Sequence, residues 1–366
     1  MNTRPSVQTI IIDSIGTASP TISKVLSESL EVPIEIVTKA LYRAPSVLVK
    51  EAPDEVLGQF LDLLSQLGLE VHAQATTDPL PPESECLDVG LYLEDASLLP
   101  KVCDQLCSFL GCTSQEALNL LLSEPCVILG HVSQATVSAL ENRMDAEVVV
   151  SDPEAAQYTL AVLSNDRLLL SQLKDYLKTA FSLVVDWNSS KAIPDLDYAT
   201  SQIIYRRYQS TGGIQLINQD FQRFEVVLTE MDPEDEAQRA ALVSLTGMPE
   251  EIVNEVAESL PIQVEASINR AILMDTLQAY ADAGLTVEAN LLSHTHHQLV
   301  LEEIKDLKKS REILSQFVPE DALPKTGHTP WYSPVPMSDL LARFAIAQLE
   351  AVGTSADYEP ISVPSS

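Results

Sequence analysis

Apolar residues recur along this chain in blocks, and the best-formed block runs from Leu242 to Ala289. The segment from Val25 to Ala73 repeats its skeleton of apolar positions. In that segment Ile34, Val37 and Leu41 share one face of an amphipathic helix, and short apolar runs predict strands. Recurrence of this kind predicts an architecture of repeated small units before any single residue is interpreted.

An interval of twelve residues between a helix-opening residue and a proline marks three of the blocks. It separates Pro33 from Pro45, Thr113 from Pro125, and Pro249 from Pro261. A proline at the first position of a helix costs little, because its missing N–H would be unpaired there in any case. A proline at the far end stops the helix. Each interval therefore predicts a short second helix, and the order within a block is β-α-α-β-α-β.

The pattern predicts four modules of this kind. We expect them over residues 1–77, 86–152, 157–219 and 222–291. The third module is degenerate, because a strand over 182–187 follows its first helix directly and its next helix opens at Pro194-Asp195. The expected fold class is α+β, with tandem small modules that are each a three-stranded sheet covered by helices.

After the fourth module the apolar period changes. Residues 292–317 predict a polar helix, and residues 318–366 predict a proline-rich tail. Within the tail, 338–352 has the spacing of a short amphipathic helix. The residues from Gly353 onward are expected to be disordered, because they contain few apolar side chains.

Aromatic and apolar side chains of this tail are the candidate partner-binding residues. They are Trp331, Tyr332, Leu340, Leu341 and Phe344. A proline-rich segment with an aromatic centre can dock in a partner's groove at a small entropic cost, and an amphipathic helix can insert its apolar face. The alternative is that the tail packs back on its own chain, since an apolar helix face must be buried somewhere.

The net charge is strongly negative. The chain has 53 acidic and 22 basic residues, which gives a net charge of −31, while 45% of its residues are hydrophobic. The hydrophobic content is typical of a folded protein. The charge argues against binding of nucleic acid or of anionic lipid, because both would repel this surface. It fits a basic protein partner, or it serves solubility alone.

The expected compartment is the cytoplasm. The apolar stretch near the start is too short for a signal peptide, and no apolar run reaches the roughly 18 residues that span a membrane. Five cysteines lie in one quarter of the chain: Cys86, Cys103, Cys107, Cys112 and Cys126. Their odd number and the lack of a disulfide framework indicate reduced thiols.

Neither the thiols nor the histidines predict a metal site. Cys103 and Cys107 share a helix face with Cys112 nearby, but the paired CxxC spacing of structural zinc sites is absent, so buried thiols are favoured. The cluster of His294, His296 and His297 could hold a transition metal only weakly, and a solvated loop is favoured. The run from Ser210 to Gly213 lacks the lysine of a phosphate-binding loop and fits a helix end.

A family resemblance is carried by small turn residues and spaced apolar residues of the last module. They are Thr246-Gly247-Met248, Glu251, Val253, Val256, Ala257, Pro261, Ala283-Gly284 and Val287-Glu288. This block resembles the C-terminal domain of the bacterial ribosomal stalk protein. There a Thr-Gly-Leu-Gly-Leu-Lys-Glu-Ala-Lys run joins the first two helices and a Gly-Ala-x-Val-Glu run forms the last strand. Leu110-Gly111 and Glu116-Ala117 stand at the corresponding places in the second module. The same fold occurs in the substrate adaptor of the Clp protease, which binds peptide N-termini.

The resemblance implies a fold rather than the activity of the family. The stalk domain binds translation factors through lysines and an apolar surface on its first two helices. In this chain those lysine positions are occupied by Glu35, Thr38, Gln115, Leu118, Glu251 and Asn254. Binding of translational GTPases in the family's manner is therefore not expected, since a shared fold does not imply a shared function.

The sequence as a whole favours a non-enzymatic role. We expect a cytoplasmic bacterial scaffold or adaptor that binds protein partners through acidic repeat modules and a C-terminal docking segment, without a cofactor or a catalytic set. The alternative is a homo-oligomeric structural protein that assembles through module surfaces and the tail helix. An enzyme with a site between modules would need a polar pocket, and no residue pattern predicts where one would lie.

Overall fold

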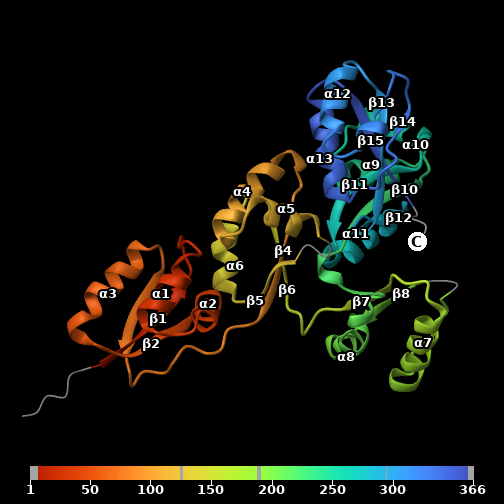
Figure 1. The fold of residues 1–366 in the computed structure, drawn as a ribbon. Coiled ribbons are helices and arrows are strands. Elements are labelled where there is room, and N and C mark those ends of the chain that lie inside the picture. Colours follow the sequence, from red (N-terminus) through yellow and green to blue (C-terminus); the bar gives the residue numbers. More distant parts are fainter. Residues whose placement is uncertain (1–6, 124–126, 188–190, 294, 362–366) are drawn as a thin grey trace, which may run out of the picture. The chain divides into compact units, whose positions relative to one another are not determined.

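The computed structural model of the chain describes residues 7–123, 127–187, 191–293 and 295–361. Over these residues it contains five small three-stranded antiparallel sheets, each accompanied by helices (Figure 1). The predicted α+β class of tandem sheet-and-helix modules is therefore confirmed. The chain divides into two compact units, Met1–Pro153 and Glu154–Ser366.

The first unit holds two modules. Module 1 consists of β1 (Val7–Ser14), α1 (Ile22–Leu30), α2 (Ile34–Tyr42), β2 (Ser46–Pro53), α3 (Asp54–Gln66) and β3 (Glu70–Ala75). Module 2 consists of β4 (Leu87–Tyr92), η1 (Ala96–Leu98), α4 (Leu99–Leu110), α5 (Ser114–Leu122), β5 (Val127–Val132), α6 (Gln134–Glu141) and β6 (Glu147–Ser151). Pro125 and Cys126 lie outside the described residues.

The second unit holds three modules. Module 3 consists of β7 (Tyr158–Val162), α7 (Arg167–Phe181), β8 (Ala192–Leu196), α8 (Tyr198–Tyr208), η2 (Gln209–Thr211) and β9 (Ile214–Asn218). Module 4 consists of η3 (Gln219–Phe221), β10 (Arg223–Glu230), α9 (Glu236–Thr246), η4 (Glu250–Ile252), α10 (Val253–Glu258), β11 (Ile262–Asn269), α11 (Arg270–Asp282) and β12 (Thr286–Leu291). Module 5 consists of β13 (His296–Glu303), α12 (Leu307–Leu314), η5 (Glu320–Ala322), β14 (Trp331–Tyr332), α13 (Asp339–Glu350) and β15 (Ser355–Ile361).

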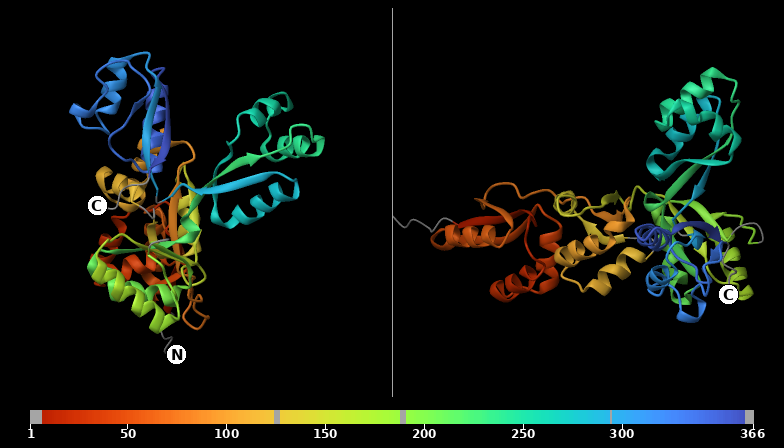
Figure 2. Two further views of the ribbon diagram at one scale, coloured as in Figure 1. Left: turned by 90° about the vertical axis from the view of Figure 1, so that its right-hand side faces the viewer. Right: turned by 90° about the horizontal axis from the view of Figure 1, so that it is seen from above.

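In every sheet the first strand of the module lies in the centre and the other two strands flank it. The orders are β2-β1-β3, β5-β4-β6, β8-β7-β9, β11-β10-β12 and β14-β13-β15. A central strand is covered more completely than its neighbours, and in β1 the consecutive residues Ile10, Ile11 and Ile12 are all buried. This explains why first strands read as unbroken apolar runs rather than as an alternation. Two further views show the helices of each module beside its strands (Figure 2).

A left-handed residue ends the first helix in three modules. Glu31, Gly111 and Gly247 have φ angles of 54°, 72° and 71°. Each stands two residues before the position that opens the second helix. A left-handed residue lets the chain reverse after a helix, and glycine adopts this conformation without the steric cost of a Cβ.

The same two core positions are buried in these three modules. The residue seven positions before the helix-opening residue is buried in each module, and it is Leu26, Leu106 or Leu242. The residue four positions after it is also buried, and it is Val37, Ala117 or Val253. These pairs join the first two helices to the sheet, so the apolar spacing of the sequence has the same structural role in each copy.

Two predictions for module 3 are wrong. Residues 182–187 form no strand, and the second strand is β8, which includes Pro194 and Asp195. The next helix begins at Tyr198, where the carboxylate of Asp197 accepts the N–H of Thr200 at 2.8 Å. The apolar residues after α7 instead pack against it, and the indole of Trp187 donates to the Leu170 carbonyl at 3.0 Å. Their alternation reflects this packing and not a hydrogen-bonded ladder.

The C-terminal region is a further module, which corrects the predicted helix over 292–317 and the predicted disordered end. His296–Glu303 is the central strand β13, the helix α12 is confined to Leu307–Leu314, and Ser355–Ile361 forms the outer strand β15. Gly353 stands two residues before β15, as Gly68 and Gly284 stand before β3 and β12, and all three have positive φ angles. The predicted amphipathic helix over 338–352 is present as α13.

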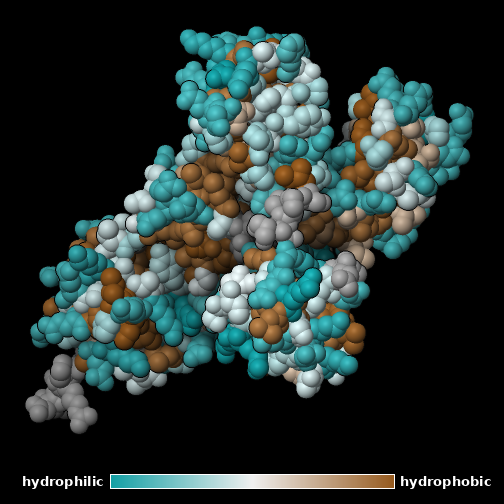
Figure 3. Space-filling model, turned by 45° about the vertical axis from the view of Figure 1, so that its right-hand side comes forward, coloured by the Kyte–Doolittle hydropathy of each residue, from teal (hydrophilic) through white to brown (hydrophobic). Residues whose placement is uncertain are grey.

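None of the helices in the described ranges is long and apolar enough to cross a membrane. On the face shown in Figure 3, hydrophilic and neutral residues cover most of the surface, with smaller apolar patches between them.

Candidate docking groove in the first unit

A groove of about 680 Å³ lies between module 1 and module 2. It is lined by α2 together with Arg43, by Leu110 at the end of α4, and by residues 129–132 of β5. Strand β5 is an outer strand that pairs with β4. The groove therefore combines a helix face with the edge of a sheet, which is a surface that an extended peptide can lengthen by one strand.

Hydrogen bonds between module 1 and module 2 form one end of the groove. The carbonyl oxygen of Tyr42 accepts the N–H of Ser133 at 3.0 Å and the hydroxyl of Thr136 at 2.8 Å. The guanidinium Nε of Arg43 donates to the carbonyl of His131 at 3.0 Å. These three hydrogen bonds hold the end of α2 against the end of β5. They therefore occupy the C-terminal end of the β5 edge.

Arg143 stabilises the same interface from module 2. It donates to the backbone carbonyls of Gly16 and Ala18 in module 1, and its guanidinium lies 5.1 Å from the ring centroid of Phe109. Phe109 in turn contacts Tyr42 edge to face, with the ring centroids 6.4 Å apart. Burial raises the pKa of Tyr42, and the nearby charge of Arg143 opposes that rise. Burial also lowers the pKa of Arg143, and the nearby Tyr42 opposes that effect.

Exposed apolar side chains flank the groove. Ile34 and Ile36 on α2 are 41% and 59% exposed. Ile252 occupies the position of Ile36 in module 4 and is 38% exposed. Large aliphatic side chains on a helix surface mark a contact surface when they gather beside a groove, whereas single ones are ordinary.

The positions of the stalk family's lysines carry no basic surface. Glu35 and Thr38 line the groove, the first exposed and the second half-buried. In module 4 the side chain of Asn254 accepts a hydrogen bond from Arg239. Lys39 is the basic side chain that α2 itself contributes to the groove, and it stands one turn after Glu35.

The five predicted partner-binding residues lie in module 5, mostly against its own core. Trp331 and Leu341 pack on the buried cluster, and the ring of Phe344 meets Phe317 edge to face at 6.0 Å. Leu340 is half-buried, while Tyr332 in β14 remains 45% exposed. Of the five, Tyr332 presents the largest accessible surface to a partner.

The thiols form no metal site in the part of the chain that the structure describes, since no group of three ligating side chains converges there. Cys103 is buried, and Cys107 and Cys112 are partly exposed. The Cys107 Sγ lies 4.0 Å from the hydroxyl of Ser114. Burial raises the pKa of Cys103 and of Cys112, and the neighbouring thiol of Cys107 adds to the rise. A raised pKa lowers the thiolate fraction that metal binding and nucleophilic attack require.

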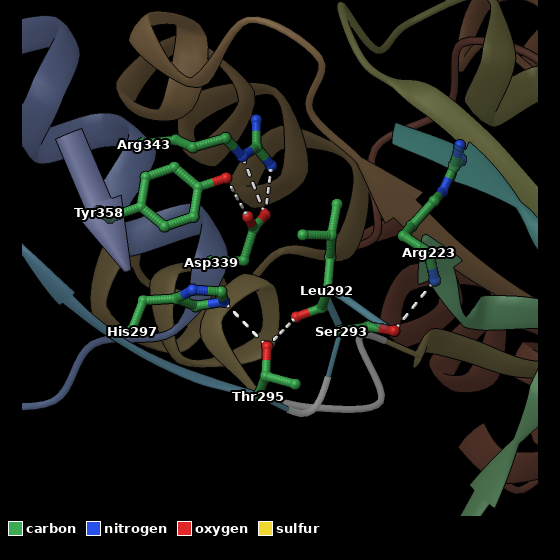
Figure 4. Close-up of polar contacts among 8 residues, drawn as sticks. All are labelled: Arg223, Leu292, Ser293, Thr295, His297, Asp339, Arg343 and Tyr358. Carbon is green, nitrogen blue, oxygen red and sulfur yellow. Dashed lines mark hydrogen bonds and ion pairs between the residues drawn. The ribbon is translucent and has the colours of Figure 1, made fainter. Parts of the chain in front are cut away.

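The expectation of a solvated loop is wrong for His296 and His297, because both residues lie in strand β13. His297 belongs to β13 and is 1% exposed, whereas its neighbour His296 is exposed. The ring of His297 bonds to Thr295 (Figure 4). His294 lies outside the described residues. Farther back, Gly212 ends η2 in a left-handed conformation, consistent with a helix end at this run.

Comparison with models of protein families, with curated proteins and with solved structures found no match for this chain. The groove itself was not predicted from the sequence. Its walls come from α2 and β5, which lie in different modules, and no local pattern indicates that two such elements will adjoin.

Proposed function

We propose that this chain is a non-enzymatic protein-binding scaffold or adaptor whose modules present docking surfaces to other proteins. The observation that carries the proposal is the groove beside Ile34, where an apolar helix face adjoins the outer strand β5. The repeated modules support it, because a chain of similar units offers several such surfaces at once. The net charge of −31 favours partners with basic character.

An extended segment is the ligand that this groove accommodates best. Its backbone can pair with the edge of β5 N-terminal to the bonds that hold His131 and Ser133, and its side chains can contact α2. This mode takes its affinity from main-chain hydrogen bonds and its selectivity from alternate side chains. A cytoplasmic location is part of the proposal and rests on the four cysteines that the structure describes, which carry free thiols.

The test is a comparison of two charge substitutions in module 1 of the full chain. Ile34→Glu places a carboxylate in the groove, while Val56→Glu places one at a similarly exposed site (52%) on α3, away from it. Proteins retained at low salt are quantified for each variant. We expect Ile34→Glu to weaken retention at least about tenfold, equivalent to ~1.4 kcal/mol, and Val56→Glu to leave it unchanged. A chain that retains no stable partner and does not self-associate contradicts the proposal.

A homo-oligomeric structural protein is the second candidate, and the outer strands favour it. Each of the five sheets has two flanking strands that pair only with the central strand in the described structure. Exposed strand edges of this kind can pair between copies. Light scattering over a range of concentrations distinguishes the two candidates, since a monomer at every concentration excludes assembly.

A further inference from the structure

His297 lies at the junction of modules 4 and 5, and its surroundings fix its orientation. Its backbone N–H donates to Met337 at 2.8 Å, and its carbonyl accepts the N–H of Met337 at 2.9 Å. Its ring meets Tyr358 edge to face, with the centroids 4.8 Å apart. His297 is 1% exposed, so its neighbours enclose the ring at the junction.

The hydrogen bonds at the junction assign the proton of the imidazole. The hydroxyl of Thr295 contacts the carbonyl of Leu292, which can only accept, so Thr295 donates to it. The same hydroxyl then accepts from Nε2 of His297, which lies 2.9 Å away (Figure 4). Nε2 thus carries the proton of the neutral ring, and Nδ1 is left as an acceptor. Among the described residues Nδ1 has no hydrogen-bond partner.

The charged side chains nearest to His297 bind other partners. Asp339 on α13 accepts from Arg343 at 2.9 and 2.8 Å and from the Tyr358 hydroxyl at 3.1 Å. Burial lowers the pKa of His297. The charge of Asp339, a hydrogen bond to the backbone of Leu292 and, more weakly, the charge of Glu225 on β10 oppose that effect, and the neighbouring His296 adds to it slightly. Protonation would therefore bury a charge together with an N–H that lacks an acceptor, which is costly.

The residues that link modules 4 and 5 are bonded to module 4 at their start. Leu292 donates its N–H to the Arg223 carbonyl at 2.9 Å, and the Ser293 hydroxyl accepts the N–H of Arg223 at 3.0 Å. Arg223 begins β10 of module 4, and Thr295 extends the connection to His297 of module 5 (Figure 4). Arg223 takes part through its backbone, so His297 is the titratable side chain in this series of contacts.

We propose that His297 is a proton-operated latch, which in its neutral form holds Leu292 and Thr295 in place and on protonation releases the join between modules 4 and 5. The sign follows from the depressed pKa of the folded state. The neutral ring is favoured on folding, so the latch is fully closed above the ordinary histidine pKa of about 6.5 and weakens as the pH falls below it. The rest of the two cores should stay folded, because it contains no other buried histidine in the described ranges. The inference goes beyond the proposed scaffold function and does not depend on it.

Amide hydrogen exchange of the full chain tests the latch. Between about pH 7.5 and about pH 5.5, which bracket the ordinary histidine pKa of about 6.5, we expect exchange of the Leu292, Thr295 and His297 amides to rise several-fold, with about tenfold as the ceiling for one histidine, after correction for the intrinsic rate. His297→Gln should remove this dependence, and the matched substitution His296→Gln, one residue away and exposed, should preserve it. Thr295→Val, which deletes the bridging hydroxyl, should give fast exchange at both pH values.

A direct titration of the imidazole by NMR uses the native chain, so it tests the proposal even if a variant misfolds. In the native chain the signal of His297 should titrate below the ordinary value. Titration of His297 at or above about 6.5 overturns the proposal. So does a rise in exchange that persists undiminished in a folded His297→Gln chain.

Discussion

The hydroxyl of Thr136 donates to the carbonyl oxygen of Tyr42 at 2.8 Å, and this bond joins two modules across 94 positions of the sequence. Thr136 is fully buried, and the same carbonyl also accepts the N–H of Ser133. In principle, a hydrogen bond from a side chain to a backbone carbonyl could join any two modules. Here they hold α6 against the end of α2, where the groove begins.

Replacement of Thr136 by valine should loosen this contact without creating an unpaired carbonyl. The substitution keeps the shape of the side chain, and Tyr42 retains its bond from Ser133, so we expect a loss of about 1 kcal/mol, the usual net value of one hydrogen bond. Hydrogen exchange at Ser133 and Val137 should report it. Thr77→Val, on the exposed loop after β3, is the control and should be neutral. A neutral Thr136→Val would show that the contact contributes nothing to the stability of the first unit.

Truncation of the equivalent core leucines should destabilise one module at a time. Leu106→Ala and Leu242→Ala each remove a fully buried side chain, and such changes cost about 2–5 kcal/mol. Exchange should quicken in module 2 for the first variant and in module 4 for the second, because the two residues lie in different units. Ser108→Ala, on the exposed face of the helix that holds Leu106, is the control. Faster exchange over the whole chain in either variant would disprove independent modules.

Alkaline pH should destabilise module 4 through Tyr280. Tyr280 is buried and its hydroxyl donates to the half-buried Glu265 at 3.1 Å. Burial, followed by the charge of Glu265, raises the pKa of Tyr280 far above the ordinary value. The protonated phenol is favoured on folding, so this stabilisation is complete below about pH 10 and declines as the pH rises above that value. Tyrosinate absorbance should show one tyrosine that ionises only when module 4 unfolds. Tyr280→Phe should abolish this delayed step, and Tyr332→Phe, on an exposed residue, should not.

Two truncations should behave in opposite ways if the C-terminal region is a module. A chain ending at Ser293 keeps the bonds from Leu292 and Ser293 to Arg223, so module 4 should stay folded and protected. A second chain ends at Val318, where the sequence pattern places the start of the proline-rich tail. This chain loses β14, α13 and β15. It would uncover Leu299 and Leu301 of β13 and should aggregate in light scattering. A monomeric chain with β13 still protected after the Val318 cut would contradict the fifth module.

The repeated core could be predicted because the same local packing of helices on a sheet recurs in each copy. The apolar period at Leu26, Leu106 and Leu242 follows from the need of a short helix to cover a small sheet. Module 5 could not be recognised in the same way. Its first helix, α12, is polar, an extended segment replaces its second helix, and β14 has only two residues. Gly353, at the position of Gly284, is the signal in the sequence that points to a closing strand.

The sequence by itself determined the fold class, the order of elements in modules 1, 2 and 4 and the net negative charge, because these depend on local periodicity and on composition. Only the tertiary structure decided which surfaces are available for function. The groove beside Ile34 exists because β5 of one module adjoins α2 of another. His297 is buried because β13 pairs with strands near the end of the chain and bridges to Met337. Contacts between residues far apart in sequence leave no periodic trace, so they become visible only once the chain is folded.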